Sequence, residues 1–525
     1  PAILDSSWLT KAENVVLRES GRITFRKGLK QKVAPSGTAI GSMTEHNDQG
    51  TNKIFASYGT SIYTVDFTSP ATAFPSSGDD VKHTVGSTTG DWQFVNFNDR
   101  LHCFHTGVIP QRYDGSLGAG SKWTAHATDP ASIATLFDPS CGMGYYGRVW
   151  VGGVAEAKDV VYYSNLLDGD DWTGGDTGLI DLAKVWGTDE IVALAPFYGK
   201  LVIFGKNNIV IYDKPDVVGS LLLNEVIRGI GLVSRDTVQA IGDDLVFLSN
   251  TGLRSLGRTT EKDKLPLTDY SLNIKDRLIR NIGQSTNVKS VYVENEGIYI
   301  MSFVDKNINY IFDFKHFTPN KVPRVTTWTF DNDREPTSMV YTNLYSGLLV
   351  GQKDGSIAGY EQHYDTDLAG ASTYTDASYT WSFETVWIDL GETVSASILK
   401  RLFMVLEGGS GATMGLKWYK DFSPTASTIT SIVLNPVTTG STSLWGASSS
   451  LYGATDAGGA HAGGGHVAAT HPAASLYAPV FGLKEYRTPL TGSAKNIKIS
   501  MDIESNGFDA SLQTLTLLHK QGKIR

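Results

Sequence analysis

Cysteine is scarce in this sequence: only Cys103 and Cys141 occur among 525 residues. Two cysteines build neither a disulfide framework nor a thiolate metal site, so we expect both to be buried structural thiols. Long apolar runs are also missing, because no stretch approaches the roughly 20 residues that cross a bilayer. The opening PAILDSSWLT lacks the basic and apolar regions of a secretion signal. The sequence therefore predicts neither a membrane span nor export by a signal peptide.

Positive charge is in deficit as well. The chain has 45 Lys and Arg against 54 Asp and Glu, a formal net charge of −9. A protein that grips nucleic-acid phosphates usually carries a positive excess, so this balance disfavours sequence-independent nucleic-acid binding, although it is compatible with a wall that DNA slides past. Charged residues make up only 19% of the chain, which predicts that part of the surface is an interface.

The motifs of nucleotide and hydrolase chemistry are absent from the sequence. It contains no GxxxxGK[ST], no GxGxxG between a strand and a helix, no GxSxG nucleophile elbow and no HExxH. The sequence is still compatible with a glycosidase that uses two carboxylates, since the two partners can be distant in the chain. It does not single out any acidic pair for that role. We therefore expect a protein that is not an enzyme and that uses no cofactor.

What the sequence does contain is a repeated unit. Glycine (55) and aromatic residues (10%) are plentiful, as is typical of short strands joined by tight turns. A strand–turn–strand unit recurs about every 49 residues, a period typical of β-propeller blades. Its apolar runs begin at Ile54, Leu101, Val149, Leu201, Leu245, Ile298 and Leu348. Runs that are apolar at every position, such as 201–204, predict strands covered on both faces. The prediction is an all-β chain with a propeller of about seven blades over 36–370.

The sequence pattern changes after a stretch of small polar residues at 371–380. Longer strand-like runs begin at Trp381, and they predict a C-terminal β-sandwich-like domain over 371–525. This domain carries an insertion at 436–484 that is rich in Gly, Ala, Ser and His and repeats SLWG, SLYG and SLYA. The repeat predicts stacked, aromatic-anchored loops or a segment that orders only in an assembly. Helical periodicity is clearest at 269–282, which we expect to lie against the propeller.

The segment 1–35 is basic. Three interpretations apply to its cations: pairing with acidic groups of a neighbouring subunit, a solvated face, or neutralisation of DNA phosphates. The first is favoured. The residues concerned are Arg18, Arg22, Arg26, Lys27, Lys30 and Lys32.

Two further clusters are candidates for a site. His461, His466 and His471 could bind a metal in an oligomer, but no acidic or thiol partner lies close, so we favour an exposed loop and expect no metal. The run SNLLDGDDWTGGD (164–176) is similar to the Asp-box turn of sialidase-like propellers without holding its spacing. We predict a polar turn bounded by a packed Trp172; its acidic residues lack the glycine and terminal glutamate of an EF-hand loop.

Several tracts resemble one family. NEVIRGIGLVSRDTVQAIGDDLVFLSNTGLRSLGR (224–258) resembles the propeller region of the tail nozzle proteins of short-tailed bacteriophages, also called packaged-DNA stabilisation or tail hub proteins. AENVVLRESGRITFRKGLKQ (12–31) looks like their opening segment, and VYYSNLLDGDDW (161–172) looks like a strand and turn that recur in them. SLWG and SLYG are similar to the aromatic repeats of their C-terminal insertion, although this insertion is richer in glycine and histidine.

The resemblance implies a structural subunit of a bacteriophage tail nozzle, made in the host cytoplasm and located in the virion. Six copies would form a homo-oligomeric tube below the tail adaptor, the head-to-tail connector, with a tail fibre or needle and the host outer surface at the tip. The tube would retain packaged DNA and conduct it during ejection without specific binding. Residues 1–35 would contact the adaptor or a neighbouring subunit. The insertion would form a gate that includes Trp445, Tyr452, His461, His466, His471 and Tyr477.

Two other functions stay open at this stage. The first is a propeller-type glycan-binding or glycan-cleaving protein at a cell surface, with aromatic and acidic contacts from loops 164–176 and 324–335. The second is a scaffold propeller in a cellular complex.

Overall fold

The protein is represented by a computed structural model. It describes residues 9–18, 21–67, 82–84, 90–118, 120–257, 269–285, 287–318, 321–331, 333–342, 344, 347–361, 367–369, 375–377, 379–391, 396–408, 412–434, 483–504 and 510–521. Strands dominate these residues. The described α-helices are short, α1 (Ala183–Trp186) and α3 (Lys275–Ile282), so the predicted all-β class is confirmed. The helix expected at 269–282 is present as a 3₁₀ turn at Leu272–Ile274 that continues into α3.

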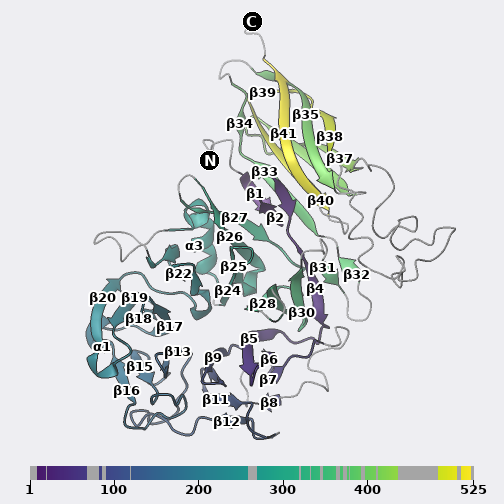
Figure 1. The fold of residues 1–525 in the computed structure, drawn as a ribbon. Helices are drawn as coiled ribbons and strands as arrows, with labels where there is room; N and C mark the ends of the chain where they lie inside the picture. The colour runs from purple at the N-terminus through teal and green to yellow at the C-terminus, as the bar shows by residue number, and fades with distance from the viewer. Residues whose placement is uncertain are drawn as a thin grey trace, which may run out of the picture.

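Seven small antiparallel sheets follow one another along the described chain (Figure 1). Sheets 1 to 4 have four strands each: β5 (Ile40–Asp48), β6 (Thr51–Tyr58), β7 (Ser61–Thr64) and β8 (Lys82–Thr84); β9 (Gln93–Phe97), β10 (Arg100–His105), β11 (Val108–Asp114) and β12 (Trp123–Ala125); β13 (Cys141–Tyr145), β14 (Arg148–Gly152), β15 (Val160–Tyr163) and β16 (Gly178–Asp181); β17 (Ile191–Phe197), β18 (Lys200–Gly205), β19 (Asn208–Asp213) and β20 (Leu222–Arg228).

Sheets 5 to 7 continue the series. Sheet 5 has three described strands, sheet 6 is part of a larger sheet, and sheet 7 takes its fourth strand from the start of the chain. Their strands are β21 (Gln239–Ile241), β22 (Asp244–Ser249) and β23 (Gly252–Ser255); β24 (Val288–Val293), β25 (Ile298–Phe303), β26 (Ile308–Phe317) and β27 (Pro323–Trp328); β28 (Pro336–Thr342), β29 (Gly347–Gln352), β30 (Ile357–Glu361) and β4 (Gly28–Val33).

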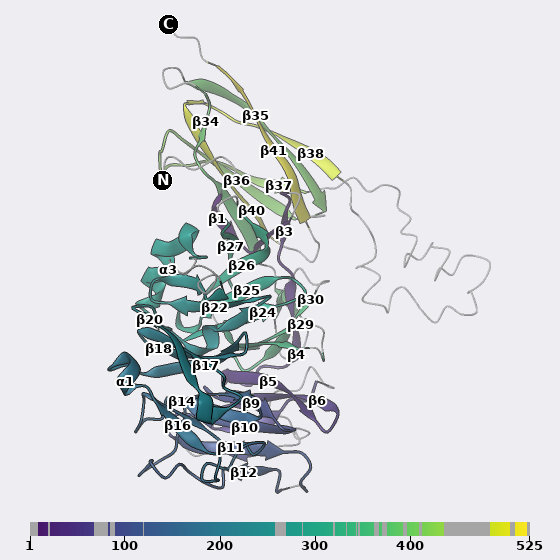
Figure 2. The ribbon, with the colours of Figure 1, turned by 60° about the vertical axis from the view of Figure 1, so that its left-hand side comes forward.

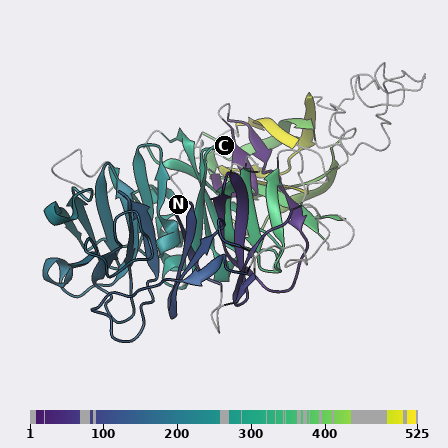
Figure 3. The same cartoon turned by 60° about the horizontal axis from the view of Figure 1, so that its bottom comes forward.

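The seven sheets form a closed circuit of contacts, which we call the ring. Each sheet touches the next through its first strand or the turn before it, and β28 of sheet 7 touches β5 of sheet 1. A separate apolar cluster fills each of the seven spaces between neighbouring sheets. Figure 3 shows the purple strands of sheet 1 beside the green strands of sheet 7, where the circuit closes. The sheets therefore stabilise one another face to face.

The apolar run at 201–204 illustrates why these strands have so little polar character. Leu201 and Ile203 pack against sheet 3, whereas Val202 and Phe204 pack against sheet 5. Because successive side chains of a strand point to opposite faces, a strand enclosed between two sheets is apolar at every position. The prediction that such runs are covered on both faces is confirmed.

The described part of the segment 1–35 does not form a unit of its own. It divides among three sheets, as β1 (Leu9–Glu13), β2 (Val15–Leu17), β3 (Ile23–Phe25) and β4. β4 pairs with β30 and completes sheet 7, while β1 lies between β27 of the ring and β33 (Thr380–Thr385) of the C-terminal part. One continuous ten-stranded sheet thus joins the ring to the C-terminal strands.

The C-terminal part consists of two facing sheets (Figures 1 and 2). β33, β34 (Ile388–Asp389), β36 (Thr413–Lys420), β37 (Ser427–Val433) and β40 (Asn496–Glu504) belong to the ten-stranded sheet; β35 (Ser397–Gly408), β38 (Leu483–Pro489), β39 (Ser493–Ala494) and β41 (Ala510–Lys520) pair with one another and with β3. One core of buried apolar side chains, including Trp381, Leu402 and Met501, lies between the two sheets. β31 (Asp367–Ala369) and β32 (Thr375–Ala377) form a separate two-stranded sheet.

Candidate functional site

Arg26 was predicted to contact the adaptor or a neighbouring subunit, and this placement is wrong. Its side chain is 0% exposed and lies at the junction of the ring and the C-terminal sheets. Its Nε donates to Asn14 Oδ1 at 3.1 Å and its Nη1 donates to the Lys27 carbonyl at 3.0 Å. The guanidinium lies over the ring of Tyr379, 3.9 Å from the ring centroid. Arg26 therefore holds two parts of its own chain together.

The other basic residues of this segment differ from one another. Lys27 is half-buried and pairs with Glu296 of the ring. Arg22 lies 3.4 Å from Glu407 of β35, so it also has a partner within the chain. Lys30 and Lys32 lie half-buried in the outer strand β4, and Arg18 is exposed. Among the six predicted residues Arg18 alone is exposed, so a contact with another subunit remains a prediction for it above all.

The predicted gate residues lie outside the described residues. These are Trp445, Tyr452, His461, His466, His471 and Tyr477.

An ionic cluster crosses the middle of the ring at the side where the first strands begin, which we call the start face. Arg235, from the turn before β21 in sheet 5, reaches Asp91 before β9 in sheet 2 at 2.8 Å. The same guanidinium donates to the carbonyl of Ser140, before β13 in sheet 3, at 2.5 Å. Lys289 of β24 pairs with Asp91 and, at 2.6 Å, with Asp236. Four sheets that are not all neighbours are thus tied together.

The electrostatics of this cluster follow from its burial and its balance of two cations and two carboxylates. Burial alone would raise the pKa of Asp236, but Arg235 and Lys289 outweigh it and hold that pKa at about 2. Burial opposes the charge of Lys289, yet the carboxylates of Asp236 and Asp91 raise its pKa. Arg235, Asp236 and Lys289 are therefore ionised at neutral pH.

The turn at 164–176 is polar and bounded by a packed tryptophan, as predicted. Trp172 is buried, and its Nε1 donates to Nδ1 of His126 at 3.0 Å. His126 Nε2 must then carry the proton that it shares with His102 Nδ1, also at 3.0 Å. Burial lowers the pKa of His126 and, helped by Arg112 and Arg100, lowers that of His102 to about 3. Both imidazoles are therefore neutral and belong to sheet 2, and the bond from Trp172 to His126 joins sheet 2 to the loop between β15 and β16 of sheet 3.

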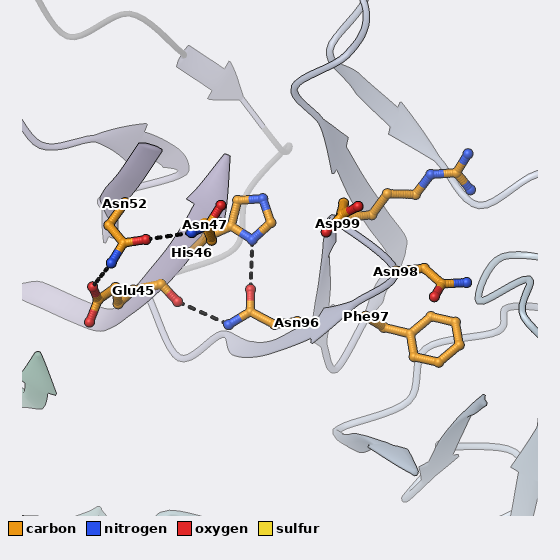
Figure 4. Close-up of a pocket in the computed structure, with 9 residues that line it drawn as sticks. Glu45, His46, Asn47, Asn52, Asn96, Phe97, Asn98 and Asp99 are labelled. Atoms are coloured by element: carbon orange, nitrogen blue, oxygen red, sulfur yellow. Dashed lines mark hydrogen bonds between the residues drawn. The ribbon is translucent and has the colours of Figure 1, made fainter. Parts of the chain in front are cut away.

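A polar hollow of about 420 Å³ opens at the opposite side of the ring, where the first strands end, which we call the turn face (Figure 4). It lies between the β5–β6 hairpin of sheet 1 and the β9–β10 turn of sheet 2. No aliphatic side chain lines it. The lining residues are Glu45, His46, Asn47, Asn52, Asn96, Phe97, Asn98, Asp99 and Arg100.

Hydrogen bonds fix the amide side chains of this hollow. His46 Nδ1 lies 2.7 Å from Asn96 Oδ1, and the Asn96 amide donates to the Glu45 carbonyl at 2.9 Å. Burial lowers the pKa of His46, so the neutral ring donates its Nδ1 proton to the amide oxygen. Asn52 donates to Glu45 Oε1 and accepts from Asn47, each at 2.8 Å. The hollow is therefore built before any ligand arrives.

Exposed apolar side chains continue from this hollow along the turn face. Asn98 donates to the Leu167 carbonyl at 2.6 Å, which joins the hollow to the loop after β15. Leu167 is 63% exposed and packs its side chain toward the turn at Gly147, beside Tyr146 (45%). Tyr198, 65% exposed in the next sheet, donates its hydroxyl to the Asp243 carbonyl of sheet 5 at 2.8 Å. The turn face thus presents a polar hollow beside a ridge of Tyr and Leu.

Cys103 and Cys141 are both buried free thiols, as predicted. Burial raises the pKa of both, that of Cys141 to about 12, so neither is a thiolate at neutral pH.

Within the described ranges, no three His, Cys, Asp or Glu side chains gather closely enough to hold a metal ion. The helices described are all too short or too polar to cross a membrane.

No family model matches the sequence, and no curated protein matches it. None of the residues that line the hollow was predicted from the sequence. A signal was available in the concentration of asparagine at 47, 52, 96 and 98, which is more than two turns require.

Proposed function

We propose that the chain is a structural subunit of the tail nozzle of a short-tailed bacteriophage. In this proposal the seven sheets are the blades of one β-propeller, closed by β4, and several copies assemble into a tube. The tube retains packaged DNA and conducts it during ejection. The chain acts as a wall and not as an enzyme.

One observation carries the proposal. β1 pairs with β27 of the ring and with β33 of the C-terminal part, so a single sheet runs through both. Backbone pairing of this kind resists bending, whereas a catalytic cleft between domains usually depends on a flexible linker. A rigid, elongated body of two β parts is what a tube wall requires. The tract 224–258, which carries the family resemblance, supplies strands of sheets 4 and 5 and also Arg235.

The ionic cluster decides where the DNA path lies in this proposal. Arg235, Asp91 and Lys289 meet across the middle of the ring, so their side chains occupy the space around its axis. A duplex cannot share that space. The channel is therefore formed between copies, and the ring of each copy is a solid block in the wall.

The proposal is tested by measuring the mass of the purified chain by light scattering and native mass spectrometry, alone and mixed with the tail adaptor. We expect a ring of copies, six by the family resemblance, with a central opening outside each propeller in negative-stain images. A strict monomer in both samples would refute the proposal.

The predicted gate has its own test. Deleting 445–480 should leave particles that assemble but lose packaged DNA, measured as nuclease-sensitive DNA after purification. Full DNA retention by the deletion variant would remove the gate from the proposal without touching the tube.

A further inference from the structure

The polar hollow on the turn face has no part in the wall described above, and its chemistry indicates a ligand. Side-chain amides supply four of its nine lining residues. Each amide has two N–H donors and a carbonyl acceptor. Asn52, Asn96 and Asn98 each use one N–H within the protein. Their second N–H groups can donate to a ligand.

The acceptors of the hollow lie beside these donors. Asn98 and Asp99 form the β9–β10 turn with φ of 49° and 55°, a left-handed conformation that displays both side chains outward. Both are exposed. Amide N–H donors next to amide and carboxylate acceptors match a vicinal pair of hydroxyl groups, because each hydroxyl both donates and accepts.

Other ligand classes fit less well. An anion would meet Asp99 and Glu45, while the cation of the hollow, Arg100, is already engaged by Asp114 at 3.0 Å and by Asp170 at 3.5 Å. An apolar ligand would find no aliphatic wall. A divalent cation is disfavoured because Glu45, His46 and Asp99 line the hollow, yet no three such groups among the described residues lie close enough together to hold a metal ion. A neutral, hydroxyl-rich ligand remains.

Aromatic rings extend the hollow in the way that sugar rings require. Phe97 lines it, and the ring of Phe97 lies against Gly144 of sheet 3, where an added Cβ would come within 3.2 Å. Past the Leu167 contact, the exposed rings of Tyr146 and Tyr198 follow on the same face. An aromatic face with a polar tip offers both a stacking surface and a hydrogen bond.

We propose that the turn face binds a neutral polysaccharide chain. The hollow holds one or two sugar units by hydrogen bonds that the Asn52 and Asn96 amides donate and the Asp99 carboxylate accepts. Its volume of about 420 Å³ lies at the lower end of the range for small-ligand sites, about 300–1,000 Å³. Tyr146 and Tyr198 stack against further units of the chain. This binding is independent of assembly into a tube.

The experiment uses the full chain on an array of neutral, sulfated and sialylated oligosaccharides, followed by calorimetry with the best neutral member and with CaCl2 alone. We expect neutral oligosaccharides to be retained. Asn96→Ala, Phe97→Ala and Tyr198→Ala should each weaken binding about tenfold or more, which corresponds to about 1.4 kcal/mol. Asn224→Ala is the matched control, because this exposed asparagine lies on the outer strand β20 of sheet 4 and its amide donates to Asp213 of β19.

Tyr198→Ala protects the test against misfolding, since this side chain is mostly exposed. Retention of no neutral oligosaccharide at millimolar concentration would overturn the proposal. So would retention of sulfated or sialylated members alone, Ca²⁺ binding without sugar binding, or sugar binding that all three variants leave unchanged. Native mass spectrometry of the same samples reports assembly separately, so failure of sugar binding and failure of the nozzle proposal are distinguished.

Discussion

Replacing Arg235 by methionine should loosen the ring across its middle. The guanidinium makes four bonds to three different sheets: to the Ser140 carbonyl, to the carbonyl and carboxylate of Asp91, and to Asp236 at 3.2 Å. Methionine keeps much of the apolar stem and removes every one of these bonds. It also leaves Lys289 alone against two carboxylates, so the cluster changes from neutral to a net charge of −1.

The magnitude follows from the burial of the partners. Breaking a buried ion pair by removing one partner costs about 3–5 kcal/mol, because the remaining charge is left in a site of low polarity. Asp91 is 56% exposed and can regain water, whereas Asp236 and Lys289 are largely enclosed. We therefore expect a loss at the lower end of this range, about 3 kcal/mol in the free energy of unfolding of the ring.

Two measurements check this value. Equilibrium unfolding in urea gives the change in free energy, and hydrogen exchange shows where the ring opens, with the amides of β9, β13 and β21 losing protection first. The matched control is Lys158→Met, which breaks a pair with Glu190 on the surface, where Lys158 is 53% exposed. Such surface pairs contribute under about 1 kcal/mol.

A double variant tests the pairing itself. Arg235→Met with Asp91→Asn removes one charge of each sign. The double variant should therefore lose at least about 1 kcal/mol less free energy of unfolding than the two single variants lose in sum. An Arg235→Met variant no less stable than the Lys158→Met control, with unchanged protection of β9 and β21, would refute a cluster that ties the ring together.

Three further predictions concern other contacts. Arg26→Ala should lower the free energy of unfolding by about 3 kcal/mol, because its hydrogen bonds and its contact with Tyr379 are lost. Arg18→Ala, at the exposed end of β2, should lower it by less than about 0.5 kcal/mol. Equal free energies of unfolding for the two variants would contradict the burial of Arg26. The His102–His126 pair should make unfolding pH-dependent: because burial lowers the folded pKa of both, the unfolded chain binds more protons below about pH 6.5, and stability should fall from there toward pH 3. The double variant His102→Phe with His126→Phe should flatten that slope between pH 6 and 4, and an unchanged slope would show that the pair is not its source. Gly231→Ala would place a Cβ 2.2 Å from the Lys206 carbonyl carbon, so we expect the free energy of unfolding to fall by more than about 2 kcal/mol. Gly219→Ala, with open space around the added Cβ, should leave the denaturation midpoint unchanged. Equal midpoints for the two variants would contradict the close approach at Gly231.

The repeat could be predicted from sequence because it depends on local pattern. All seven positions that mark it fall in the second strand of a sheet, from Ile54 in β6 to Leu348 in β29. Apolar runs and turn residues are properties of a few neighbouring residues, and they are the same whichever sheet lies beside them. The all-β class and the number of strand–turn–strand units could therefore be predicted from the sequence.

The N-terminal strands could not be placed in the same way, because their partners are distant in the chain. β1 pairs with β27 and β33, and β4 pairs with β30, so each pairing depends on where the rest of the chain brings those edges. The basic residues of this segment favoured an exposed surface, so the sequence did not predict that its strands pair within the chain. Arg26 was predicted to contact another subunit, and its place in the alternation of Ile23 and Phe25 with polar residues also favours an exposed side chain, yet the structure buries every residue of β3. A buried arginine is recognised only when Asn14 and Tyr379 are seen beside it.

The threading of residues 9–33 has a mechanical consequence. β1 carries the joint between the ring and the C-terminal sheets, and β4, a short distance along the chain, closes the ring. Arg26 lies between these two strands and bonds to Asn14 beside β1, so the closure of the ring and the joint share one buried contact. A load on the C-terminal sheets then passes into β27 and β30 through backbone hydrogen bonds and not through a flexible linker. In the tube that we propose, this arrangement would resist bending between the two parts of each copy, because β27, β1 and β33 belong to one sheet.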